Sequence, residues 1–216
     1  MFKGAIFDLD GVIVDTVPLH YEAWYRLFHD DYGLEFDLSV YEHKVDGRPR
    51  MDAVHTMLPM LSTEEQQQAG NTKQGYYLDM LAAGKLKVFN SSIDFIQDLL
   101  KNNVKLVAAS SSRNATFILE SIDLLKDFIG VISGSDITHG KPHPEIFLKA
   151  AKLLNLSTAE CIVFEDAKAG VEAAKAGGFY CVGVNRHQRN EHFLSADLKV
   201  NDLKEVSFLK LNELMK

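Results

Sequence analysis

Two aspartates follow a short apolar run near the start of the chain. Asp8 and Asp10 are separated by one residue, come after the apolar run 2–7, and are followed by Gly11. If that run is a buried strand, both carboxylates leave its carboxyl end on the same side. Two crowded carboxylates are unfavourable there unless a cation or a proton relieves their repulsion. A single exposed aspartate would be read as a turn or cap residue, but the pair favours a catalytic metal site.

A second acidic pair, Glu165 and Asp166, follows another apolar run at 161–164. Neighbouring strands of a parallel sheet would bring this pair close to the first. Hard oxygen ligands of this kind suit Mg²⁺, which usually binds one or two carboxylates together with substrate phosphate and water. The sequence therefore predicts Mg²⁺ as cofactor, and the residues expected around it are Asp8, Asp10, Glu165 and Asp166.

Two further features suit a phosphate substrate. A third apolar run, 105–109, ends in the turn 110–114, whose hydroxyls and following helix N-terminus are typical of a phosphate site, although helix capping explains most serine-rich turns. Lys141 lies in a stiff turn between Gly140 and Pro142. An isolated lysine is usually a solvated surface residue, and it is the rigid turn and the accompanying acidic pairs that make Lys141 a candidate.

The elements that must position these residues alternate along the chain. Apolar runs at 2–7, 105–109, 130–132, 161–164 and 180–184 predict buried strands, and amphipathic helical patterns separate most of them. Asn114 is expected to cap a helix that carries Ile118, Ile122 and Leu125, and Pro144 is expected to open the next one. This alternation is typical of an α/β protein with a doubly wound parallel sheet.

Residues 16–83 do not follow the alternation. They show helical patterns without a convincing strand, for example Tyr21, Trp24 and Phe28. We interpret them as a helical cap domain inserted into a core made of residues 1–15 and 84–216, with hinge strands near residues 15–16 and 83–84. In open α/β folds such an insertion lies near the sheet edge where ligands bind.

The four acidic, serine and lysine features occur in a recognisable order. Together they resemble the four sequence motifs of the haloacid dehalogenase superfamily, and the resemblance covers essentially the whole chain. It implies a Rossmann-like core in which Asp8 is the nucleophile that forms an aspartyl-phosphate and Asp10 is the general acid and base. Ser110 and Lys141 would hold the phosphoryl oxygens. Mg²⁺ would be bound by Asp8, the Asp10 backbone carbonyl and Asp166, with Glu165 ligating it or holding a metal-bound water.

The inserted segment resembles the helical cap of the branch that contains β-phosphoglucomutases and small sugar-phosphate phosphatases. By that resemblance Thr16 orients Asp10, and Arg50 clamps the non-transferring phosphate. Taken alone, Trp24 fits the cap core better than a sugar platform. The residues expected at the substrate are Thr16, His20, Trp24, Gly47, Arg50, Lys73, Tyr77, Ser111, Ser112 and Asn114.

One loop departs from the pattern of the mutases. Where they typically read Lys-Gly-Val-Ser-Arg, this chain has Asp46, Gly47, Arg48, Pro49 and Arg50. The glycine and the last arginine are kept, an aspartate replaces the lysine, and Arg48 or Lys44 could supply the missing charge. The loop is equally consistent with another sugar phosphate or with a phosphatase.

Four functions are compared. The leading prediction is conversion of β-glucose 1-phosphate to glucose 6-phosphate through glucose 1,6-bisphosphate, and the alternative is a sugar-phosphate phosphatase. The two differ in whether a sugar hydroxyl or water accepts the phosphoryl group. A non-enzymatic phospho-acceptor switch is disfavoured because the acidic pair opens the chain and a large cap follows. An inactive sugar-phosphate-binding protein is disfavoured because every catalytic position is filled.

The composition narrows the partners. The chain has 216 residues, with 23 Lys and Arg against 30 Asp and Glu, which is a formal net charge of −7. That balance argues against nucleic acid and against an anionic membrane surface. No stretch resembles a membrane span or a signal peptide. We therefore expect a soluble, cytoplasmic monomer whose partner is a small phosphorylated sugar.

The remaining cysteines and histidines carry weaker signals. Cys161 and Cys181 lie in apolar runs and are expected to be buried free thiols. His139 and His143 have the spacing of helical metal ligands, but Pro142 and Pro144 prevent a regular helix, so no zinc site is predicted there.

Overall fold

The chain forms two compact units. The computed structural model describes residues 2–45, 48–186 and 190–215. One unit comprises Met1–Asp15 and Lys87–Lys216, and the other is Thr16–Leu86. The second boundary lies three residues beyond the predicted one, because residues 83–84 still close helix α4 (Thr63–Ala82). The chain returns to the larger unit through β3 (Lys87–Val88), which pairs antiparallel with β2 (Val14–Asp15).

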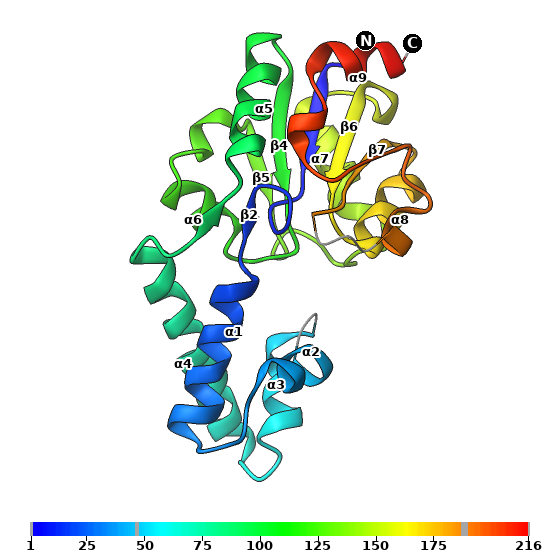
Figure 1. The fold of residues 1–216 in the computed structure, drawn as a ribbon. Coiled ribbons are helices and arrows are strands. Elements are labelled where there is room, and N and C mark those ends of the chain that lie inside the picture. The colour runs from blue at the N-terminus through cyan, green and yellow to red at the C-terminus, as the bar shows by residue number, and fades with distance from the viewer. Residues whose placement is uncertain (1, 46–47, 187–189, 216) are drawn as a thin grey trace. The chain divides into compact units, whose positions relative to one another are not determined.

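The larger unit is built on a six-stranded parallel sheet (Figure 1). Its strand order is β5-β4-β1-β6-β7-β8, so the chain starts in the middle, winds outward to one edge and returns to wind toward the other. The doubly wound α/β fold is thus confirmed. The strands are β1 (Gly4–Phe7), β4 (Lys105–Ala109), β5 (Gly130–Ile132), β6 (Cys161–Glu165), β7 (Tyr180–Val184) and β8 (Leu198–Val200).

Side chains of β1 alternate between two buried faces. Ile6 belongs to a core shared with α7 (Glu145–Leu154) and α8 (Lys168–Ala176). Phe7 points the other way, where its ring stacks on Phe164 at 4.6 Å and meets Phe95 of α5 (Asn90–Lys101) edge-on at 6.2 Å. Both faces are covered, which is why most positions of β1, β4, β6 and β7 are apolar instead of alternating with polar residues.

The helix after β4 is shorter than its sequence pattern predicted. Helix α6 (Ala115–Ser121) ends before Ile122, because Asp123 adopts a left-handed conformation with φ of 57°. Asn114 occupies the cap position as expected, but its side chain makes no capping hydrogen bond. Helix α9 (Phe208–Leu214) closes the chain, and Phe208 packs on Phe2 with ring centroids 5.4 Å apart.

Among the described residues of the smaller unit, the regular elements are all helices, joined by loops. Trp24 and Phe28 stack at 4.9 Å in its core, so Trp24 is a core residue that is only 5% exposed. The segment after α1 continues as a π-helix. The remaining helical elements are α1 (Val17–Tyr25), η1 (Arg26–Asp31), α2 (Leu38–Lys44) and α3 (Arg50–Met57).

Two general features complete the fold. Among the described residues, no helix combines the length and the apolar character needed to cross a bilayer. Cys161 and Cys181 are both buried free thiols, as predicted.

Candidate active site

The carboxyl ends of three neighbouring strands define the site in the larger unit. Phe7 is in register with Phe164 and with Ala108, so the residues that follow β1, β6 and β4 emerge side by side. The backbone N–H of Asp8 donates to the Phe164 carbonyl at 2.9 Å, which continues the ladder by one residue and places Asp8 beside Glu165. In sheets of this topology, this is where ligands bind.

Lys141 joins the two carboxylates. Its Nζ donates to Asp8 Oδ1 and to Glu165 Oε1, each at 2.5 Å. The lysine comes from the loop before α7, and its side chain is only 10% exposed. The second oxygen of Glu165 accepts the Ala167 N–H at 2.8 Å. Both oxygens of Glu165 are therefore engaged within the protein.

Burial and crowding change the acidity of this cluster. Burial raises the pKa of Asp8 to about 7, with Glu165 and Asp10 adding to the rise while Lys141 opposes it. The pKa of Asp166 is also raised well above its ordinary value, again by burial first and then by Glu165 and Asp8. Burial alone would lower the pKa of Lys141, but the two carboxylates raise it above its usual value. The single positive charge of Lys141 therefore does not balance the negative charge that the neighbouring carboxyl groups would carry if all were ionised.

A tight loop after β1 receives the side chain of Asp166. Gly11 has φ of +72°, and a Cβ added there would lie 1.9 Å from Asp166 Oδ2. The loop is closed by the Gly11 N–H, which donates to the Val14 carbonyl at 2.7 Å. Only glycine combines this backbone conformation with room for the carboxylate.

This donor set fits Mg²⁺. Asp8 and Asp166 offer two carboxylates at the same end of the sheet, and both are hard oxygen donors. The raised pKa values of the two carboxyl groups show a deficit of positive charge that a divalent cation relieves. Glu165 fits the set less well as a direct ligand, because Lys141 and Ala167 already occupy its oxygens.

The serine turn lies on the other side of β1. Ser110 follows β4, is 1% exposed, and donates its N–H to the Ile132 carbonyl at 3.0 Å. Its Oγ accepts the Ser112 N–H at 3.1 Å, and Ser112 Oγ accepts the Asn114 N–H at 3.2 Å. These bonds shape the turn, and Ser111 is exposed at its tip.

A separate cluster lies within the smaller unit. Lys73 of α4 is 3% exposed, and its Nζ donates to Nδ1 of His20 at 2.7 Å. The same Nζ lies 4.9 Å from the Trp24 ring centroid and 5.1 Å from that of Tyr77. The His20 ring stacks on Tyr77 at 4.3 Å. Four of the predicted substrate residues are thus brought together by α1 and α4.

The electrostatics of this cluster are unusual. Burial, followed by repulsion from Arg50, lowers the pKa of Lys73 to about 7. Burial, followed by Lys73, lowers the pKa of His20 to about 3, so this histidine is neutral at physiological pH. Nη1 of Arg50 donates to Gln74 Oε1 at 2.9 Å. The unit holds two basic side chains whose charges a bound anion would compensate.

Thr16 and Gly47 are the two other predicted substrate residues in this part of the chain. Thr16 precedes α1 and is 3% exposed, and its carbonyl accepts the His20 N–H at 2.9 Å. Gly47 lies outside the described residues, as does Asp46, so the loop that departs from the mutase pattern is not described at its centre.

Sequence reasoning missed Arg186. Its Nη2 donates to Ser92 Oγ at 2.9 Å, and its guanidinium lies 4.0 Å from the ring centroid of Phe89, while Nη1 pairs with Asp202. Ser92 Oγ in turn donates to the Val12 carbonyl at 2.6 Å. Arg186 therefore anchors the loop after β1. A single arginine in a polar stretch has no spacing that would have identified it.

Comparisons with family models, curated proteins and solved structures all point to the same family. The model of the haloacid dehalogenase-like hydrolases matches residues 2–178. The β-phosphoglucomutase of Bacillus subtilis is 34% identical over 98% of this chain and 94% of its own length. The validoxylamine A 7'-phosphate phosphatase of Streptomyces hygroscopicus is 32% identical over 95% of this chain and 96% of its own. A crystal structure of β-phosphoglucomutase from Clostridium difficile has a TM-score of 0.81 and 30% identity, covering 100% of this chain and 97% of that one.

Proposed function

The chain belongs to the haloacid dehalogenase-like hydrolase family, and we propose that it is a Mg²⁺-dependent phosphotransferase acting on small phosphorylated sugars. The finer proposal is that it converts β-glucose 1-phosphate to glucose 6-phosphate through glucose 1,6-bisphosphate. The likeness to the Bacillus subtilis mutase over nearly the whole chain supports it. The observation that carries the chemistry is Asp8, buried at the end of the central strand with Lys141 2.5 Å away.

In the first half of the reaction a carboxylate oxygen of Asp8 attacks the phosphorus. The new O–P bond makes an aspartyl-phosphate, and the bond between phosphorus and the leaving oxygen breaks. Asp10 donates a proton to that leaving oxygen. Lys141 and Ser110 bind the oxygens of the phosphoryl group, which is mainly a matter of position and charge in this type of transfer.

In the second half the roles reverse. Asp10 takes the proton from an incoming hydroxyl group, whose oxygen attacks the phosphorus, and the Asp8 carboxylate leaves. If the hydroxyl belongs to a sugar monophosphate, this half-reaction forms the bisphosphate. The bisphosphate then transfers its other phosphoryl group to Asp8, the isomeric monophosphate leaves, and the enzyme is a mutase. If water takes its place, inorganic phosphate is released and the enzyme is a phosphatase.

Mg²⁺ would be held by Asp8, Asp166 and the Asp10 carbonyl, and when bound it supplies positive charge against the transferring phosphoryl group. Glu165 then has a different task. Because its carboxylate accepts hydrogen bonds from Lys141 and from Ala167, it holds the lysine in place. In this proposal Glu165 is a positioning residue for Lys141 and not a metal ligand.

The smaller unit supplies the second phosphate site in this proposal. Lys73 and Arg50 repel each other, and burial already disfavours the charged form of Lys73. A phosphate dianion bound by both would raise the pKa of Lys73 again, so substrate binding and lysine protonation reinforce each other. His20, neutral and hydrogen-bonded to Lys73, orients its amine.

The phosphatase alternative rests on two observations. Asp46 stands where the mutases typically carry a lysine, which removes one positive charge from the loop that holds the second phosphate. The relatives of similar identity also include a phosphatase. Both observations bear on the acceptor and leave the phosphoryl chemistry at Asp8 unchanged.

A coupled assay distinguishes the two. The chain is given β-glucose 1-phosphate and Mg²⁺ with and without catalytic glucose 1,6-bisphosphate, and glucose 6-phosphate and inorganic phosphate are measured in parallel. A mutase forms glucose 6-phosphate in a bisphosphate-dependent reaction. Release of phosphate without glucose 6-phosphate would overturn the mutase proposal and support the phosphatase.

The nucleophile is tested by the variant Asp8→Asn, which should abolish turnover of every sugar phosphate. The matched control is Asp94→Asn, at an exposed aspartate of α5 in the same unit, and it should retain activity. Full turnover by Asp8→Asn would contradict the assignment.

A further inference from the structure

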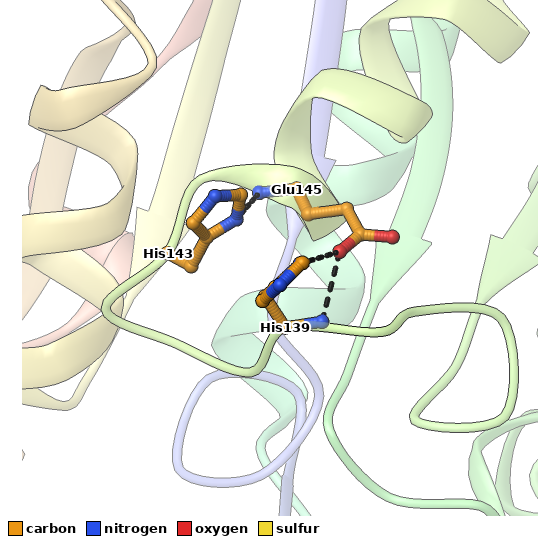
Figure 2. Close-up of side chains that lie close together, drawn as sticks. All are labelled: His139, His143 and Glu145. Carbon is orange, nitrogen blue, oxygen red and sulfur yellow. Dashed lines mark hydrogen bonds and ion pairs between the residues drawn. The ribbon is translucent and has the colours of Figure 1, made fainter.

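Two histidines and a glutamate gather on the outer side of the loop that carries Lys141. Figure 2 shows the carboxylate of Glu145 directed toward His139, and the ring of His143 directed toward the backbone nitrogen of Glu145. One ligand atom from each lies within 4.8 Å of the others. Among the described residues, this is the one group of three or more His, Cys, Asp or Glu side chains that meets this limit. From the sequence, no zinc site is predicted at these histidines, because Pro142 and Pro144 exclude a regular helix.

A turn rather than a helix brings the two histidines together. The His143 N–H donates to the Gly140 carbonyl at 3.0 Å, which reverses the chain between the two imidazoles. Their ring centroids are 4.7 Å apart, and α7 then begins at Glu145. The prolines that prevent a helix therefore do not separate the ligands.

The carboxylate of Glu145 is held in an ionised state. One of its oxygens, Oε2, accepts the His139 N–H at 2.8 Å and lies 3.1 Å from His139 Nδ1. The other oxygen pairs with Lys149 at 2.7 Å. This pairing first, and then the backbone N–H groups of His139 and Thr138, lower the pKa of Glu145 to about 2. A metal ligand that is already deprotonated has no proton to lose on binding.

Two imidazoles and one carboxylate suit a transition metal better than Mg²⁺. Imidazole nitrogen is a common ligand of Zn²⁺ and related ions, whereas Mg²⁺ prefers oxygen ligands. Ligand atoms around a tetrahedral zinc ion lie roughly 3.3 Å apart for bonds of about 2.0–2.1 Å. The present separations of up to 4.8 Å must shorten to reach this spacing, and the His139 side chain, which is 63% exposed, can rotate toward solvent.

Existing hydrogen bonds at His143 and Glu145 oppose binding. The Glu145 N–H donates to Nδ1 of His143 at 3.2 Å, and Lys149 competes for the carboxylate through Oε1. The first is a long hydrogen bond that a metal at the same nitrogen replaces. Oε2, the oxygen nearest His139, already accepts the N–H groups of His139 at 2.8 Å and Thr138 at 3.2 Å, so a metal at Oε2 would compete with the longer of these bonds. The histidines also line an open depression of about 430 Å³, which leaves room for water in the remaining coordination position.

We propose that His139, His143 and Glu145 form a second cation site, for Zn²⁺ or another divalent transition metal that favours nitrogen ligands. It uses none of the residues assigned to Mg²⁺. His139 and His143 stand two residues before and two residues after Lys141, so a bound ion ties together both arms of the turn that presents this lysine. The proposal concerns metal binding and does not depend on which sugar phosphate the chain converts.

The test is a titration of the metal-stripped full chain in millimolar Mg²⁺, which fills the oxygen site. Zn²⁺ binding is measured by calorimetry, and Co²⁺ binding by its visible absorption. We expect one ion per chain. His139→Gln and His143→Gln should each weaken binding at least about ten-fold.

His29→Gln is the matched control, because His29 is an exposed histidine whose Nδ1 lies 2.8 Å from a single carboxylate, that of Asp30. This variant should bind the ion as the wild type does. Glu145→Gln is less useful, since Glu145 also organises the start of α7. Absence of binding in the presence of Mg²⁺, or equal affinity in both histidine variants and the wild type, would overturn the proposal.

X-ray absorption at the zinc edge gives a readout that does not depend on how the variants fold. The wild-type chain loaded with one Zn²⁺ should show scattering from two imidazole rings. A shell made of oxygen ligands alone would place the ion at the carboxylate site and refute the proposal.

Discussion

Replacing Lys141 with methionine should shift the pH dependence of turnover to higher pH. Asp8 Oδ1 and Glu165 Oε1 each lie 2.5 Å from Nζ of Lys141, so they are at most about 5 Å apart. With Lys141 in place its charge at least offsets that of Glu165, whereas without it Asp8 faces the Glu165 carboxylate alone. At an effective dielectric constant of about 20, two unit charges at this separation repel by about 3 kcal/mol, which is a lower bound on the change. That energy corresponds to roughly two pKa units.

The consequence for Asp8 follows from its pKa of about 7 with Lys141 in place. Removing the lysine should raise this pKa by roughly two units. At pH 7 the ionised and nucleophilic fraction then falls from about half to roughly one in a hundred. Bound Mg²⁺ would lower the pKa of Asp8 in the wild type and in Lys141→Met alike. The informative quantity is therefore the difference in this pKa between the two proteins.

The assay is the pH profile of kcat at saturating Mg²⁺ and substrate between pH 6 and 10. The acidic limb of the Lys141→Met profile should lie roughly two pH units above that of the wild type, so the loss is largest at low pH and is partly recovered at alkaline pH. Lys105→Met is the matched control, because that amine donates to the Leu154 carbonyl and to neither carboxylate. A loss that is the same at every pH would refute the electrostatic reasoning and leave only a contact to the phosphoryl group.

Three further predictions concern stability and metal. Because the pKa of Asp8 is raised from 3.8 to about 7, the metal-free folded chain holds a proton that the unfolded chain releases, and this group lowers stability as pH rises from about 4 to 7. Mg²⁺ relieves this effect, so the increase in Tm on adding Mg²⁺ should be larger at pH 8 than at pH 5, and an equal increase would contradict it. The depressed pKa of Lys73 has the opposite sign: wild-type stability should rise between about pH 7 and 10, whereas Lys73→Met should lack that slope in thermal unfolding. Gly11→Ala should lower the free energy of unfolding by about 1–3 kcal/mol for its positive φ and weaken Mg²⁺ binding through its clash with Asp166, measured by denaturant unfolding and calorimetry; wild-type affinity would argue against Asp166 as a ligand.

Much of the core could be predicted from local patterns. The apolar runs at 105–109, 130–132 and 180–184 coincide with strands β4, β5 and β7, because strands covered on both faces are rich in apolar residues. Strand β8 could not be found in this way, since the exposed Lys199 at its centre breaks the apolar run. The early end of α6 was also missed, because the conformation of Asp123 is not encoded in the hydrophobic pattern.

The candidate site also has a part that the sequence predicts and a part that it does not. That Asp8 and Glu165 are neighbours follows from two apolar runs that each end in acidic residues, provided that the runs pair in parallel, and the register confirms the pairing. No sequence pattern predicts that the Glu165 carboxylate accepts hydrogen bonds within the protein. Its two oxygens are engaged by Lys141 and Ala167 because α7 and α8 bring those residues to the same end of the sheet.

What the sequence alone determined, then, is the type of fold and the identity of the acidic, hydroxyl and basic residues at strand ends. Periodicity and turn residues report on neighbours along the chain, and these suffice to order the elements. Only the tertiary structure decided that Lys73 is a buried amine against His20, and that His139 and His143 meet across a proline turn. Burial, pKa and the geometry of ligands depend on groups distant in sequence, so they exist only once the chain has folded.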